Sequence, residues 1–132
     1  MTLLDSAVVA GFLKADDALH AAASPAVRAA AAEGSLIASV VTVTELLAGA
    51  RLGHHDEQVV WDFFRQLVAT IIPFTLDLAD RAAELRAGHR ALKLPDAIIL
   101  ATGEQHADTI VTADERWGGV TALRCPVTVV GS

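Results

Sequence analysis

The chain has a single cysteine, no long apolar run and fewer basic than acidic residues. Because Cys125 is alone, an intrachain disulfide is excluded, which fits a reducing compartment. No apolar stretch is long enough to span a bilayer, and the N-terminal residues lack the basic region of a secretory signal. We therefore expect a cytoplasmic protein that is not inserted in a membrane.

Basic residues are too few for a protein that coats nucleic acid. The 10 Lys and Arg residues are outnumbered by 16 Asp and Glu residues, so the formal net charge is −6. Proteins that bind nucleic acid only through phosphate attraction are usually basic, which disfavours an extended duplex-coating role. The acidic balance does not exclude an enzyme that touches a few phosphates through a metal ion.

Several catalytic signatures are also missing. The 5 histidines form no metal-type pair at helical spacing. There is no Gly-x-Ser-x-Gly nucleophile motif and no glycine-rich phosphate loop. Acidic residues are therefore the remaining candidates for catalytic groups.

What the chain does contain is enough apolar sequence for one folded domain. Its 132 residues are 53% hydrophobic, so we expect a single domain over residues 1–132. Strands are predicted near residues 2–4, 35–41, 71–74, 109–111 and 127–130, with helical sequence between them. A helix is expected to break and restart at Ser24-Pro25. This alternation predicts a three-layer α/β/α sandwich with a mostly parallel sheet of four to five strands.

Four acids occupy positions that a surface charge would rarely take. Asp5 and Asp114 follow predicted strands, whereas Glu45 and Asp96 lie in the first turn of apolar helices. In open α/β sheets, ligands bind outside the carboxyl ends of the strands. Asp108 precedes its strand and is excluded. If the four carboxylates meet, their repulsion requires a cation, and carboxylates suit Mg²⁺ or Mn²⁺.

Each acid also has a simpler interpretation. Asp5 is a good helix N-cap, and Asp96 complements a helix dipole. Glu45 completes a capping box with Thr42, and Asp114 lies in a sequence typical of a turn. The shared sheet edge is what favours a common site.

Four motifs in order resemble a PIN domain, and more narrowly a VapC-type toxin of a bacterial toxin–antitoxin pair. They are Leu-Leu-Asp5-Ser6, Val43-Thr44-Glu45-Leu46-Leu47, Leu94-Pro95-Asp96-Ala97-Ile98-Ile99 and Ile110-Val111-Thr112-Ala113-Asp114-Glu115-Arg116-Trp117. The resemblance covers essentially the whole chain. Each motif alone is weak, and their order and spacing carry the specificity.

The resemblance implies a metal-dependent endoribonuclease whose catalytic and metal-binding acids are Asp5, Glu45, Asp96 and Asp114. Ser6 and Thr112 match hydroxyl positions beside the site. One or two Mg²⁺ or Mn²⁺ ions would activate a water for in-line attack on an RNA phosphodiester, leaving 5′-phosphate and 3′-hydroxyl ends. A cognate antitoxin protein and a homodimer are further implications. Glu115 takes the place of a further acid found in some members, and its contact with a metal stays open.

RNA binding needs some positive charge near the acids. Arg116 is the candidate RNA contact because it follows Asp114, whereas Arg86, Arg90 and Lys93 fit an ordinary solvated helix face slightly better. Trp61, Phe63 and Phe64 cannot all face the core of one helix, so one of them is a candidate interface residue.

Two other functional classes compete with the nuclease. A PIN-like binding or scaffold module would act through protein partners, but it has no need of all four acids. A phosphoacceptor signalling domain wants an acidic pair after its first strand and a lysine after a late strand. This chain has Ser6 and Ala7 after Asp5, and neither of its lysines follows a late strand.

Overall fold

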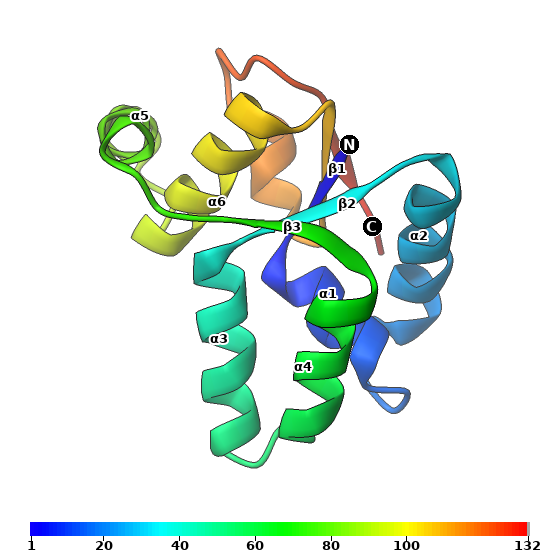
Figure 1. Cartoon of the computed structure of the whole chain (residues 1–132). Helices are drawn as coiled ribbons and strands as arrows, with labels where there is room; N and C mark the ends of the chain where they lie inside the picture. The colour runs from blue at the N-terminus through cyan, green and yellow to red at the C-terminus, as the bar shows by residue number, and fades with distance from the viewer. Residues whose placement is uncertain (132) are drawn as a thin grey trace.

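Five strands form one parallel sheet in the order β3-β2-β1-β4-β5 in the computed structural model, which describes residues 1–131 (Figure 1). The strands are β1 (Thr2–Leu4), β2 (Leu36–Ser39), β3 (Val68–Ile72), β4 (Thr109–Thr112) and β5 (Val127–Val129). The helices are α1 (Ser6–Leu13), α2 (His20–Glu33), α3 (Val40–Arg51), α4 (Glu57–Gln66), α5 (Leu76–Gly88), α6 (Leu94–His106) and the short 3-10 helix η1 (Glu115–Gly119). The predicted α/β class and parallel sheet are confirmed.

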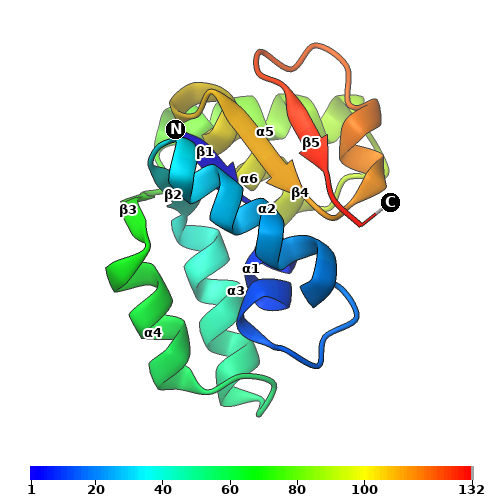
Figure 2. The same ribbon diagram turned by 90° about the vertical axis from the view of Figure 1, so that its right-hand side faces the viewer.

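Helices cover both faces of the sheet, because successive side chains of a strand point to opposite faces. Leu4 of β1 packs in one core with Val8 of α1 and other residues of α1 to α4. Its neighbour Leu3 packs in a second core with Leu78 of α5 and Ile99 of α6. The two helical layers lie on opposite sides of the sheet (Figures 1 and 2). The three central strands β2, β1 and β4 are mostly buried, whereas the edge strands β3 and β5 are largely exposed or half-buried.

The order of the strands creates a switch point beside β1. From β1 the chain adds β2 and β3 on one side, then crosses over to place β4 and β5 on the other. β1 and β4 pair in parallel, with Leu4 opposite Val111, so their carboxyl ends reach the same edge. Open α/β sheets bind ligands at such switch points. Residues that directly follow β1 and β4 therefore come together.

The predicted helix break at Ser24-Pro25 is wrong. Helix α2 continues through Pro25, and the interruption lies after Leu13 instead, where α1 ends. The Asp17 carboxylate accepts a hydrogen bond from the N–H of Leu19 at 2.8 Å. Such a local side-chain bond gives the backbone an alternative to the helix, so the acidic segment between α1 and α2 is what separates them.

Helix α6 packs tightly on the sheet and thereby fixes the position of its first turn. Residues 97–103 of α6 are all buried, as the apolar sequence predicts. At Gly103, an added Cβ would lie only 2.4 Å from Cγ1 of Ile110 on β4, so a larger residue cannot fit without movement. No helix within residues 1–131 is long and apolar enough to cross a membrane.

Candidate functional site: acidic residues at the switch point

Asp5 lies at the centre of the candidate site. It follows β1, caps α1 and is only 6% exposed. Its Oδ1 accepts the N–H of Ser6 at 2.7 Å, and its Oδ2 accepts the hydroxyl of Thr112 at 2.8 Å. The pKa of Asp5 is raised to about 6, chiefly by burial; the two hydrogen bonds lower it, and the charges of Asp96 and Glu45 add to the rise. Both of these acids therefore lie within electrostatic range of Asp5.

Glu45 does not form the predicted capping box with Thr42. Helix α3 begins earlier, at Val40, and its N-cap is Ser39, whose hydroxyl accepts the N–H of Val41 at 3.0 Å. The run of β-branched residues at the start of α3 resembles a strand in sequence, which hides the true start of the helix. Glu45 therefore lies in the second turn, where it is free for other contacts.

The contact that Glu45 makes is with the hydroxyl of Ser6. The Ser6 Oγ–H donates to Oε1 of Glu45 at 2.7 Å, and the buried Thr42 Oγ1 lies 3.1 Å from the same hydroxyl. Ser6 thus links α1 to α3, while its own N–H contacts Asp5. The two carboxylates are connected through one serine.

Asp96 supports its own helix and also faces the site. Its Oδ2 accepts the N–H of Lys93 at 3.1 Å, so Asp96 does stabilise the start of α6. The charge of Asp96 nevertheless contributes to the raised pKa of Asp5 and to the raised pKa of Arg116. Asp96 is therefore within electrostatic range of Asp5, which follows β1, and of Arg116, which follows β4.

Asp114 forms an ion pair with Arg116. Nε and Nη2 of Arg116 contact Oδ1 and Oδ2 of Asp114 at 2.9 and 2.6 Å, and the Arg116 N–H donates to Oδ1 at 3.0 Å. The hydrogen bond from the Arg116 side chain is the main reason that the pKa of Asp114 is lowered. The N–H of Asp114 donates to Oγ1 of Thr112 at 3.0 Å. Thr112 therefore contacts both Asp114 and Asp5.

The acids share one edge without forming a ready-made cage. Among residues 1–131, no three His, Cys, Asp or Glu side chains are close enough to hold a metal ion as they stand. In the same residues, no basic side chain pairs with Asp5, Glu45 or Asp96. A buried carboxylate with two acids in electrostatic range is nevertheless a donor set that suits a divalent cation.

Sequence reasoning missed three contributions to this site. Thr42, interpreted as a cap, is fully buried beside Ser6. Lys93, assigned to a solvated face, lowers the pKa of Asp114 through its charge. Arg116, predicted as an RNA contact, pairs with Asp114 in this structure. A basic residue two positions after a strand-end acid is a signal that could have suggested this pair.

Other candidate residues lie outside this group. Glu115 is exposed on η1, next to Trp117, which is buried. On α4, Phe63 and Phe64 pack in the core, whereas Trp61 is partly exposed beneath Arg65, whose guanidinium carbon lies 5.0 Å from the ring centroid. Trp61 is thus the residue of the aromatic trio that faces outward.

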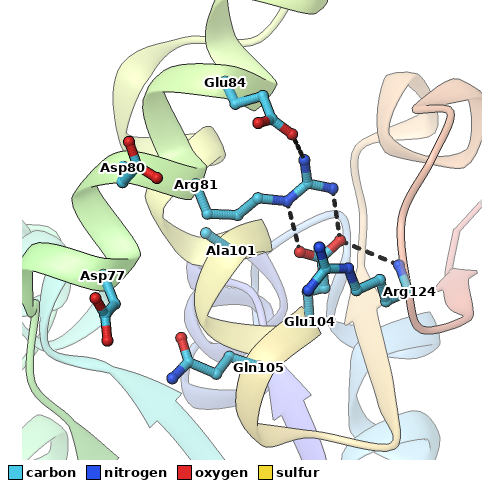
Figure 3. A pocket seen from close by; sticks show the side chains of 8 residues that line it. All are labelled: Asp77, Asp80, Arg81, Glu84, Ala101, Glu104, Gln105 and Arg124. Carbon is cyan, nitrogen blue, oxygen red and sulfur yellow. Dashed lines mark hydrogen bonds and ion pairs between the residues drawn. The ribbon is translucent and has the colours of Figure 1, made fainter.

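A polar hollow of about 370 Å³ lies between α5 and α6, at the other end of α6 from Asp96 (Figure 3). Arg81 reaches from α5 to Glu104 on α6, with Nε to Oε1 at 2.7 Å and Nη2 to Oε2 at 2.9 Å. Arg81 also donates to the carbonyl of Ala122 at 2.9 Å, and the Arg124 N–H donates to Glu104 at 3.1 Å. These bonds connect the segment after η1 to both helices. We therefore assign the residues around the hollow a structural role.

Comparison with known proteins assigns the family. Residues 2–122 match the model of the PIN domain. The chain therefore belongs to the PIN domain family, a family of nucleases that typically use divalent metal ions. A search of curated proteins finds no match.

Solved structures with the same fold include a toxin–antitoxin complex and a toxin. A toxin–antitoxin complex from Klebsiella pneumoniae gives a TM-score of 0.75 at 27% identity, covering 98% of this chain and 97% of that chain. The FitAcB structure from Neisseria gonorrhoeae gives 0.72 at 26% identity, covering 96% of each chain. A sarcin–ricin loop cleaving toxin from Mycobacterium tuberculosis gives 0.74 at 21% identity, covering 94% of this chain and 98% of that chain, and shows the fold alone.

Proposed function

We propose that this protein is a divalent-metal-dependent endoribonuclease and the toxin of a toxin–antitoxin pair. The observation that carries the proposal is the buried Asp5 at the switch point, within range of the charges of Glu45 and Asp96. A buried carboxylate with no basic partner costs desolvation energy, and a bound cation would offset that cost. Membership of the PIN family and the toxin neighbours support the reaction class.

The four acids would hold one or two Mg²⁺ or Mn²⁺ ions. An ion bound there supplies a water of lowered pKa and stabilises charge on the phosphate during cleavage. The hydroxyl of Thr112 orients the Asp5 carboxylate, and the hydroxyl of Ser6 orients Glu45. These hydrogen bonds restrict the rotation of the two carboxylate side chains before a metal ion binds, so less conformational entropy is lost on binding.

Arg116 is the proposed RNA contact. Its side chain is 52% exposed, and it lies beside Asp114. A planar guanidinium matches the geometry of a phosphate, so Arg116 suits the backbone of a strand that enters the site. We propose that the cleavage leaves 5′-phosphate and 3′-hydroxyl ends and that it takes place in the cytoplasm.

The proposal predicts that Asp96→Asn abolishes RNA cleavage by the purified protein, by at least about 10³-fold, because a metal-binding carboxylate is lost. Asparagine keeps an oxygen that accepts the N–H of Lys93, so the helix start should survive. The measurement is cleavage of single-stranded RNA in Mg²⁺ or Mn²⁺, with the cut ends mapped.

The matched control is Asp108→Asn, which changes an acid at the opposite sheet edge, where Asp108 pairs with the N-terminal amine at 2.5 Å. This variant should cleave as the wild type does. Cleavage retained by Asp96→Asn would reject the assignment of the acids. A wild-type protein that cuts no RNA would favour the binding or scaffold role instead.

An antitoxin chain is the proposed protein partner. A neighbour at 27% identity comes from a toxin–antitoxin complex. An apolar groove of about 190 Å³ runs between α1 and α4, lined by Phe12, Leu13, Val59, Phe63 and Leu67 among others. Val59 and Leu67 are 44% and 45% exposed, so an apolar segment of a partner would gain by covering them.

A homodimer is the proposed assembly. The segment from β3 into α5 exposes three large apolar side chains, Ile71, Phe74 and Leu76, and Leu76 is 86% exposed. Exposed apolar side chains gathered in a short segment are typical of an interface. We propose that a second copy covers this segment, which leaves the α1–α4 groove to the antitoxin.

A further inference from the structure

We propose that Arg116 is an internal competitor of the divalent ion, which holds Asp114 in the metal-free protein and releases it when the metal binds. The inference rests on the proposed metal site and gives Arg116 a role in metal binding. It starts from the ion pair that Arg116 forms with Asp114, one of the four acids, in this structure.

The contact between the two side chains has the geometry of a specific pair. Arg116 makes two parallel hydrogen bonds to the two oxygens of Asp114, at 2.9 and 2.6 Å. A third donor, Nη1, contacts the carbonyl of Ala91 at 3.2 Å, in the segment that leads into α6. The guanidinium therefore bridges Asp114 to the segment before Asp96.

The pair is also weak enough to be exchanged. Arg116 is 52% exposed and Asp114 is 21% exposed, so water screens their attraction. A divalent ion carries twice the charge and attracts Asp96 and Asp5 as well as Asp114. An ion at the site would thus outcompete the guanidinium, and the freed Arg116 would stay near the position of a substrate phosphate.

The test measures Mn²⁺ binding without RNA, by titration calorimetry or electron paramagnetic resonance. Arg116→Ala should bind Mn²⁺ about fivefold more tightly than the wild type, since the ion no longer displaces a bidentate partner. Arg86→Ala is the matched control, because Arg86 is an exposed arginine on α5 that neither pairs with Asp114 nor shifts its pKa. Its Mn²⁺ affinity should stay within about twofold of the wild type.

A second readout follows the guanidinium itself. In the ¹⁵N spectrum of the wild type, the Arg116 Nε–H signal should shift on saturation with Mg²⁺, and the Arg81 Nε–H signal should not. Equal Mn²⁺ affinity of wild type and Arg116→Ala would overturn the inference. An equal gain in Arg86→Ala, an unshifted Arg116 signal or the absence of Mn²⁺ binding in both proteins would do the same.

The inference and the proposed function can fail separately. A protein that shows the Arg116 effect on Mn²⁺ but cuts no RNA keeps the inference and loses the nuclease. A protein that cuts RNA at the four acids, with no change in Mn²⁺ affinity in Arg116→Ala, keeps the nuclease and loses the inference.

Discussion

Replacing Asp5 with asparagine is expected to stabilise the metal-free protein by about 2 kcal/mol at pH 8, although it should abolish cleavage. The folded state raises the pKa of Asp5 from 3.8 to about 6. The stability that Asp5 contributes is therefore fully present below pH 3.8 and is lost as the pH rises through about 6. Asparagine carries no charge and avoids this loss, at the cost of a weaker hydrogen bond to Thr112.

The measurement is urea unfolding of both proteins between pH 4 and pH 8 in the presence of a chelator. The advantage of Asp5→Asn should grow from pH 4 to about pH 7 and then level off, because the wild type alone loses its proton in this range. Asp108→Asn, at the opposite sheet edge, should show no such growth. An Asp5→Asn variant less stable than wild type at pH 8, or a difference independent of pH, would contradict the account of the buried charge.

Replacing Arg81 with methionine should lower the free energy of unfolding by about 3 kcal/mol, because it leaves a buried carboxylate without its cation. The Glu104 side chain is only 3% exposed, and Arg81 contacts both of its oxygens. The hydrogen bond from Arg81 is the main reason that the pKa of Glu104 is lowered. The stability from Glu104 is therefore present at neutral pH and lost in acid.

The double variant Arg81→Met with Glu104→Gln is the control. Glutamine is neutral and keeps an oxygen for the N–H of Arg124, so most of the stability should return in urea unfolding at pH 7. Additive losses in the double variant would show that the two side chains act independently. That outcome would contradict the claim that the ion pair connects α5, α6 and the segment after η1.

The shared sheet edge of Asp5 and Asp114 in the candidate site could be predicted from sequence, because it depends on strand ends. Asp5 and Asp114 follow apolar runs, and parallel strands place such residues at one edge. Asp108 precedes its strand, and the structure places it at the other edge, beside the N-terminal amine. The α/β class and the parallel sheet follow in the same way, because strands and helices alternate along the chain.

Details that depend on local competition did not follow from sequence. Pro25 suggested a helix boundary, but an acidic segment with the side-chain bond of Asp17 is what interrupts the helix. The start of α3 was hidden by β-branched residues, and with it the contact between Ser6 and Glu45. The pairing of Arg116 with Asp114 depends on how η1 folds back, which composition and spacing do not specify.

The most direct test of the central claim is a crystal structure with Mn²⁺, in which anomalous scattering locates the ion. The account predicts an ion roughly 2 Å from carboxylate oxygens of Asp5 and Asp96, with Glu45 and Asp114 turned toward it and Arg116 turned away. An ion bound at another place, or four carboxylates that stay apart at saturating Mn²⁺, would contradict it.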